Sequence, residues 1–254
     1  MIVCKVKDIV IGEGMPKICV PVVFTNQQDI VAELIRLEKM DIDLIELRID
    51  YFSDLLNDQK LTELFNSIVA LNLSKGIILT YRSEKEGGLG KLTIPEYIEL
   101  YKLALNSNAF DIYDVELTSG TNAIITLTSL IHQAGKKVLM SVHDFKRTPS
   151  IDTMMEKFKL MDSLEADIFK LAVMPEDFKE VLALMETTLK ANELYDRPIV
   201  TMSMSSMGIV TRLMGEQFGS AITFGKAQEG SAPGQIDVQS LKQVLQVVHD
   251  NIEN

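Results

Sequence analysis

The sequence has 254 residues, with no Trp, three His and only two Cys. Cys4 and Cys19 form no C-x-x-C pair, which excludes the common zinc-ribbon and thioredoxin-like motifs. Residues 1–16 mix charged with apolar side chains and do not resemble a secretory signal peptide. We therefore expect two reduced, packed thiols and a cytoplasmic protein.

Long apolar runs and nucleotide-binding motifs are also missing. No run approaches the ~20 apolar residues that span a membrane, so we predict no membrane partner. The sequence has no H-E-x-x-H zinc motif. The segment Gly219–Lys226 lacks the spacing and the final hydroxyl of a P-loop. Gly12-Glu13-Gly14 lacks the third glycine of a dinucleotide motif, and we predict a turn there.

Acidic residues outnumber basic ones, 36 Asp and Glu against 25 Lys and Arg, which gives a formal net charge of −11. Such a surface repels nucleic-acid phosphates and anionic membranes, so we predict no nucleic-acid partner. A small anionic substrate remains compatible, because Arg and Lys beside a site outweigh distant surface charge.

Short β-rich apolar runs alternate along the chain with segments of helical spacing. The predicted strands are 18–24, 44–50, 77–82, 112–117, 137–145, 168–175, 198–204 and 221–226. Predicted helices include 28–40, 94–106, 122–134, 150–164, 176–190 and 238–248. Strands alternating with helices predict a parallel sheet. The count of eight and the chain length favour a closed (β/α)8 TIM barrel over an open doubly wound sheet.

The predicted barrel occupies the whole chain. There is no composition break, repeat or linker, so residues 1–254 are expected to form a single catalytic domain. Val3–Lys7 and Ile9–Glu13 precede the first strand and are predicted to form a β-hairpin that closes the amino end of the barrel. Gly225–Gln235 is a long loop after the last strand.

Polar side chains interrupt strands that should be almost entirely apolar in a barrel. These residues are Glu46, Arg48, Arg82, Asp114, Glu116, Ser141, His143, Lys170 and Ser203, with Glu86 shortly after Arg82. Buried polar groups need partners, and the carboxyl ends of barrel strands form the active site in this fold. We therefore expect many of these groups to converge there.

Lys170, inside the sixth predicted strand, has two interpretations. It could form a structural ion pair with Asp114, Glu116 or Glu46. Alternatively, burial could leave its amine partly uncharged and able to form an imine with a ketone. A single His is commonly structural, but His143 shares the same end of the barrel with Lys170 and a carboxylate, which favours a general base.

Ordered motifs along essentially the whole chain carry a resemblance. They are Gly-Glu-Gly at 12–14, Glu46-Leu-Arg48-Ile-Asp50, Tyr81-Arg82, Glu86-Gly-Gly, Asp114-Val-Glu116, His143-Asp-Phe145, Lys170-Leu-Ala-Val-Met-Pro175, Thr201-Met-Ser-Met204, Arg212, Phe218-Gly-Ser220 and Ser231-Ala-Pro-Gly-Gln235. Together they resemble the type I 3-dehydroquinate dehydratase family, lyases of the shikimate pathway that leads to chorismate and the aromatic amino acids.

The resemblance implies the catalytic roles. Lys170 resembles the lysine that forms a Schiff base with the C3 ketone of 3-dehydroquinate. His143 resembles the general base that removes the C2 proton and then protonates the departing C1 hydroxyl. Glu86 resembles the carboxylate that orients His143. The implied product is 3-dehydroshikimate, and neither a metal nor a cofactor is implied.

The resemblance also implies the substrate contacts. Arg212 resembles the guanidinium that binds the substrate carboxylate. The other implied substrate contacts are Glu46, Arg48 and Arg82 at the ring hydroxyls, and Ser231 and Gln235 in a closing loop. The implied pocket walls are Phe145, Met202, Met204 and Phe224. The family leads us to expect a homodimer.

Four positions depart from the commonest pattern of this family, namely Pro21, Leu47, Leu89 and Val142. They neighbour the residues above, so their effect concerns affinity. Two other functions stay open on the residues alone. One is another Schiff-base barrel lyase such as a class I aldolase, although no phosphate loop is evident after the last two strands. The other is a non-enzymatic ligand-binding barrel.

Overall fold

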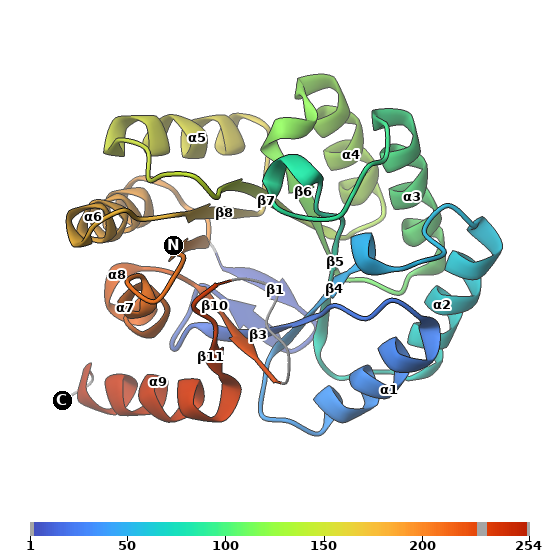
Figure 1. The fold of residues 1–254 in the computed structure, drawn as a ribbon, viewed down its shortest axis with the longest axis horizontal. Coiled ribbons are helices and arrows are strands. Elements are labelled where there is room, and N and C mark those ends of the chain that lie inside the picture. Colours follow the sequence, from blue (N-terminus) through green and yellow to red (C-terminus); the bar gives the residue numbers. More distant parts are fainter. Residues whose placement is uncertain (1–2, 228–232, 253–254) are drawn as a thin grey trace.

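The computed structural model describes residues 3–227 and 233–252. Its central element is a parallel barrel surrounded by helices (Figure 1). The barrel strands are β3 (Lys17–Val22), β4 (Leu44–Arg48), β5 (Gly76–Thr80), β6 (Ile112–Glu116), β7 (Lys137–Asp144), β8 (Ile168–Val173), β9 (Ile199–Ser203) and β10 (Ile222–Lys226). Each predicted strand is found within a few residues of its expected range.

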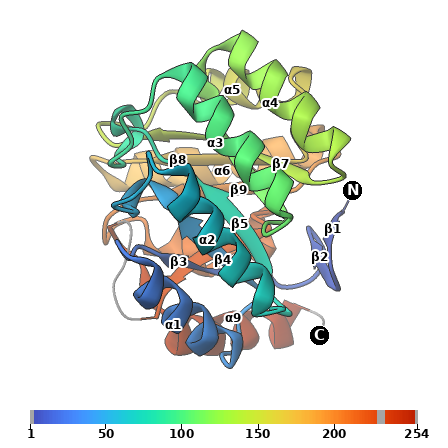
Figure 2. The same ribbon diagram turned by 90° about the vertical axis from the view of Figure 1, so that its right-hand side faces the viewer.

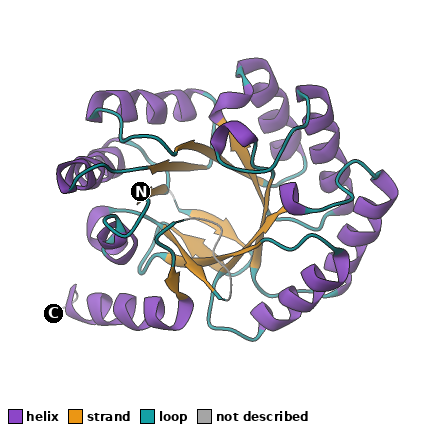
Figure 3. Cartoon of the chain, in the orientation of Figure 1, coloured by secondary structure: helices purple, strands orange, loops and turns teal. Residues whose placement is uncertain are grey.

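Helices follow the strands and form the outer layer (Figure 3). They are α1 (Gln27–Glu38), α2 (Asp58–Ala70), α3 (Ile94–Ser107), α4 (Thr121–Gln133), α5 (Ile151–Ser163), α6 (Phe178–Leu194), α7 (Ile209–Leu213), α8 (Gly215–Phe218) and α9 (Val238–Ile252). The predicted helical ranges are confirmed, whereas α2 was not among them. Two short helices, α7 and α8, follow β9. Ser150 caps α5 by accepting a hydrogen bond from the Thr153 amide.

The barrel closes between β9 and β10. The strand order is β11 (Ile236–Asp237), β10, β3 and then β4 to β9, and neighbouring strands in this order pair in parallel. Ile199 of β9 bridges to Ser220, and the Ala221 amide donates to the Ile199 carbonyl at 2.7 Å. The closed (β/α)8 barrel is therefore confirmed, with a seam between β9 and β10 that is much less extensively paired than its other joints.

A hairpin covers the amino end of the barrel, as predicted (Figure 2). Its strands β1 (Cys4–Val6) and β2 (Ile9–Ile11) pair antiparallel. Cys4, Val6 and Ile11 pack in one buried cluster with inward-facing barrel residues such as Leu139. Both cysteines are free and buried, which agrees with the expected reduced thiols.

Residue alternation along the strands separates the two cores. In β4, Ile45 and Leu47 pack outward in the cluster beneath the helices, whereas Leu44 packs in the barrel interior. The alternation therefore points Glu46 and Arg48 into the barrel as well. Among the described helices, none is long and apolar enough to cross a membrane.

Three carboxylates and one hydroxyl brace the amino end of the barrel at alternate strands. Asp43, directly before β4, accepts a hydrogen bond from the amide of Ile18 in β3 at 2.8 Å. Asp111, directly before β6, accepts from Ile77 of β5 at 2.9 Å. Asp167 and Ser220 repeat the arrangement by accepting from amides of β7 and β9, at 2.8 and 3.1 Å. These four contacts tie neighbouring strands together at one end.

Candidate active site

Lys170 lies at the centre of the carboxyl-terminal half of the barrel and is only 3% exposed. Its Nζ atom lies 3.2 Å from Glu46 Oε1 and 3.4 Å from Asp114 Oδ2. The amine also lies 4.4 Å from the centre of the Phe224 ring, within the range of a cation–π contact. The ion pairs expected of a structural lysine are thus present, but they hold the amine in a cavity.

His143, near the end of β7, faces the same cavity and is oriented by Glu86. The imidazole Nδ1 lies 3.0 Å from Glu86 Oε2, which also accepts the His143 backbone amide at 3.1 Å. Burial, with Arg82, Lys170 and Arg48 nearby, holds the pKa of His143 well below its usual value. A neutral ring that donates from Nδ1 leaves Nε2 free to accept a proton.

Glu86 itself is almost completely buried, and its burial raises its pKa to about 7 against the opposing effect of Arg82. The neighbouring Glu116 and Asp114 also raise this pKa because they carry the same charge. Glu86 is therefore close to gaining a proton at neutral pH while it holds the His143 ring.

Arg82 connects the acidic groups. Its Nη1 donates to Glu116 at 2.9 Å, to Ser141 at 2.9 Å and to Glu86 at 3.3 Å. Its Nη2 donates to Asp114 at 2.6 Å. Both terminal nitrogens are thus occupied by protein groups, so Arg82 sets the charge and geometry of the site as well as lining it.

The structure places Arg82 just beyond its strand, which corrects the predicted strand end. Strand β5 ends at Thr80, and the Arg82 amide donates to Asp50 Oδ1 at 3.3 Å in place of a ladder partner. Asp50 also holds Arg48 through two hydrogen bonds of 2.9 Å. Its position is likewise corrected, because residues 49–51 form a 3-10 turn and not the end of a strand.

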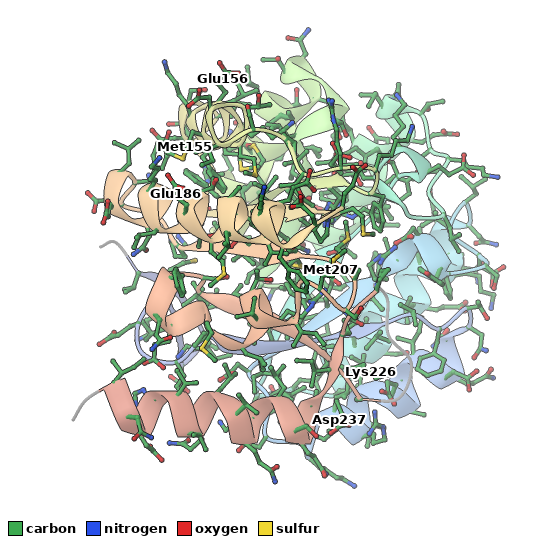
Figure 4. The ribbon with its side chains drawn as sticks, turned by 60° about the vertical axis from the view of Figure 1, so that its left-hand side comes forward. Met155, Glu156, Glu186, Met207, Lys226 and Asp237 are labelled. Atoms are coloured by element: carbon green, nitrogen blue, oxygen red, sulfur yellow. The ribbon has the colours of Figure 1, made fainter. Side chains whose placement is uncertain are left out.

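These side chains surround one cavity of about 460 Å3, counting the space at its mouth. Its walls are Glu46, Arg48, Arg82, Glu86, Gly87, His143, Phe145, Lys170, Ala172, Met202, Met204, Phe224 and Gln235. In Figure 4, Met207, Lys226 and Asp237 mark the same carboxyl end of the barrel.

Two predicted site residues are not among these walls. Ser231 lies outside the described residues. Arg212, on α7, is 2% exposed and lies directly behind the cavity wall, where Nη1 contacts Met202 Sδ at 3.9 Å and the Phe224 carbonyl at 3.4 Å. Its Nη2 donates to the Pro233 carbonyl at 3.1 Å.

The Arg212 guanidinium has no carboxylate within salt-bridge distance among residues 3–227 and 233–252, and its Nε is buried without a hydrogen-bond partner. Burial lowers its pKa to about 10, since no acidic group offsets the loss of hydration. A buried cation in this state favours an anionic ligand.

Sequence reasoning missed several residues around the cavity. Gly87 and Ala172 were not predicted as walls, and Thr118 was not noted although its hydroxyl donates to Glu86 Oε1 at 2.5 Å. Gly87 carries a detectable signal, because its φ of 80° and the adjacent Phe145 ring leave no room for a side chain. Thr118 carries none, because Thr is ordinary in a loop.

Among the four departures from the family pattern, Leu47 and Val142 pack outward beneath the helices. Leu89 is 53% exposed. None of these three, nor Pro21, is among the cavity walls. Among the described residues, no group of three or more His, Cys, Asp or Glu could hold a metal ion.

Comparison with known proteins identifies the family to which this chain belongs. The family model described as Type I 3-dehydroquinase matches residues 18–252. The chain belongs to the type I 3-dehydroquinase family. The 3-dehydroquinate dehydratase of Salmonella typhimurium is 40% identical over 245 residues, which cover 96% of this chain and 97% of that protein.

Solved structures of this type I family extend the similarity to three dimensions. A type I 3-dehydroquinate dehydratase from Clostridium difficile, solved with covalently modified comenic acid, gives a TM-score of 0.95 at 40% identity over 98% of each chain. A 3-dehydroquinate dehydratase from Geobacillus kaustophilus gives 0.94 at 32% identity, over 98% of this chain and 96% of that one. The matches therefore include the whole barrel.

Proposed function

We propose that this chain is a hydro-lyase that converts 3-dehydroquinate to 3-dehydroshikimate through an imine on Lys170. One observation carries the proposal, namely a buried lysine amine that shares a cavity with an oriented His–Glu pair. Family membership supplies the substrate. A binding protein would need neither a reactive amine nor a general base.

The first step joins Lys170 to the substrate. Its amine attacks the C3 carbonyl, and the carbonyl oxygen leaves as water when the C=N bond forms. Glu46 and Asp114 hold the amine in position through contacts of 3.2 and 3.4 Å. The resulting iminium withdraws electrons and so acidifies the C2–H bond.

His143 then handles the proton. Its Nε2 accepts the C2 proton, while the C–H electron pair moves towards the iminium to give an enamine. The electrons return to form the C1=C2 bond as the C1 hydroxyl leaves, and His143 returns the proton so that the hydroxyl departs as water. Hydrolysis of the imine releases 3-dehydroshikimate and restores the Lys170 amine.

The substrate carboxylate is assigned to Arg212, because that guanidinium is buried and has a nitrogen without a partner. We assign the ring hydroxyls to the polar walls Glu46, Arg48 and Arg82 together with Gln235, and, in the adjoining loop, to Ser231. Phe145, Met202, Met204 and Phe224 supply the apolar walls. We assign no step to a metal or cofactor.

Borohydride trapping tests this function. Incubation with 3-dehydroquinate and sodium borohydride should give a reduced adduct on Lys170, located by intact mass and peptide mapping, with loss of activity. An adduct on another residue would contradict the assignment of Lys170. If folded protein forms no adduct with confirmed substrate, a different keto substrate, such as that of a class I aldolase, replaces the proposal.

The proposal also covers the location, the oligomeric state and the domain organisation of the protein. We propose a cytoplasmic homodimer in which residues 1–254 form one catalytic domain. A stripe on α6 supports a second copy, because Phe178 and Leu182 are 67% and 65% exposed and lie one helical turn apart. Sedimentation equilibrium should give twice the chain mass, and Leu182→Glu should reduce the measured mass to that of one chain.

Scanning calorimetry tests the single domain, and it should show one unfolding transition.

A further inference from the structure

Thr118 lies in a 3-10 turn, η3 (Leu117–Ser119), that follows β6. Its hydroxyl donates a hydrogen bond of 2.5 Å to Glu86 Oε1, across 32 residues of sequence. The other carboxylate oxygen, Oε2, accepts from the His143 amide, from His143 Nδ1 and from Arg82. Thr118 thus holds the oxygen that faces away from the imidazole.

Anchoring both oxygens fixes the plane of the carboxylate. A carboxylate held at Oε2 alone could rotate about its terminal bond, and Oε2 would then leave the line of the Nδ1–H bond. The Thr118 bond restricts that rotation. It therefore acts on the direction of the His143 ring and on which ring nitrogen carries the hydrogen.

The same bond favours the charged form of Glu86. Burial, and to a smaller extent Glu116 and Asp114, raise the pKa of Glu86, Arg82 and Thr118 lower it, and the net result is a pKa of about 7. His143 in turn faces Arg82, Lys170 and Arg48, which disfavour its protonation. Loss of the Thr118 hydroxyl should therefore leave Glu86 protonated over a wider range of pH.

Thr118 is not among the walls of the reaction cavity. It lines a separate depression with Ser83 and Glu116, on the far side of the Arg82 cluster. A substitution at Thr118 consequently changes no contact with a molecule bound near Lys170. Its effect on the reaction must pass through Glu86.

We infer that Thr118 is a positioning residue that holds Glu86 charged and aligned with His143. This inference rests on the proposed function, because it assigns His143 as the proton carrier. A merely structural Thr118 would cap the turn and affect stability alone.

Kinetics of two matched variants test the inference. Thr118→Val keeps the shape but removes the hydroxyl, and Thr118→Ser keeps the hydroxyl. Thr118→Val should lower kcat by about tenfold, with KM within about twofold, and should move the acid limb of the kcat/KM profile to higher pH. Thr118→Ser should retain most of kcat and the original limb. Equal losses in both variants, or an unchanged Thr118→Val profile, would overturn the inference.

A measurement without turnover separates this inference from the proposed function. The chain has three histidines, so 15N-imidazole spectra with His132→Gln and His249→Gln assign His143. In the wild type, Nδ1 of His143 should carry the hydrogen near neutral pH, and Thr118→Val should shift the His143 titration, whereas Thr118→Ser should not. An unchanged titration in Thr118→Val overturns the inference even if the enzyme dehydrates its substrate. Thr118→Ala replaces Thr118→Val if the latter does not fold.

Discussion

The two ends of the barrel use carboxylates in different ways. At the amino end, Asp43, Asp111 and Asp167 accept hydrogen bonds from backbone amides of the neighbouring strand. At the carboxyl end, Asp114 and Glu116 accept from the side chain of Arg82. The residue type is the same, but the donors differ. A backbone donor fixes two strands together, whereas side-chain donors can be rearranged around a substrate.

The difference also appears in charge. The amino-end carboxylates are partly exposed, and besides their backbone donors Asp111 contacts Lys7 and Asp167 contacts Lys137 and His132. At the carboxyl end, Lys170 and Arg82 are almost fully buried and face several acidic groups. Such an arrangement is costly unless every charge is paired, so it indicates a site and not a brace. Substitutions at the two ends should therefore affect different measurements.

The largest expected effect is at Lys170. Lys170→Ala removes the nucleophile, so turnover should fall below detection while the circular dichroism spectrum remains that of a folded barrel. Lys170→Met serves as a control that preserves most of the side-chain volume, and it should be equally inactive. Measurable turnover in either variant would show that the imine is not required.

Arg212 should give the next largest effect. Arg212→Ala should weaken transition-state and substrate binding by about 2–5 kcal/mol, because a buried charge contact with the substrate is lost. Steady-state kinetics should show this mainly as a higher KM. Arg212→Lys keeps the charge without the planar fork, and it should recover part of the loss. A wild-type KM in Arg212→Ala would exclude the carboxylate assignment.

A smaller effect should follow from pH. Ionised Glu86 is needed to orient neutral His143, and burial raises the pKa of Glu86 to about 7. Adding a proton therefore inactivates the pair, so kcat/KM should fall about tenfold per pH unit as the pH drops below about 7. Glu86→Gln should lower the rate and flatten this limb. An unaltered limb in that variant would assign the titration to another group.

The amino end should affect stability alone. Asp43→Ala removes the acceptor of the Ile18 amide and should lower the free energy of unfolding by about 1–2 kcal/mol, with kcat unchanged. Asp41→Ala, at an exposed position on the same loop, is the matched control and should be nearly neutral. Urea unfolding measures both. A loss of kcat in Asp43→Ala would mean that the two ends are coupled.

The sequence predicts the carboxyl end better than the amino end for a physical reason. Lys170 and Glu46 stand out because charged residues are rare in buried strands. Asp43 and Thr118 do not stand out, because both types are common in loops and their partners lie far along the chain. Arg82 lines the cavity, but its predicted position in a strand is wrong, since its amide binds Asp50 and not a neighbouring strand.

The position of Arg212 could not be predicted from the sequence pattern either. Its role was expected from the family, but its place behind Met202 and Phe224 depends on the turn between β9 and β10. Local pattern does not determine that turn, because two short helices replace one long one there. The wall residue Ala172 has no polar group that would mark it in a sequence.

The contacts of Lys170 also bear on how this chain is synthesised. Lys170 binds Glu46 and Asp114, which precede it by 124 and 56 residues. During synthesis, Glu46 and Asp114 therefore emerge from the ribosome well before Lys170, whose amine neutralises part of their charge. A fragment that ends after β6 would enclose Glu46 and Asp114 without that amine. In such a fragment Arg82 would still pair with Asp114, but Glu46 would lack its contact with Lys170, so the chain completes the charge cluster only once β8 has been added.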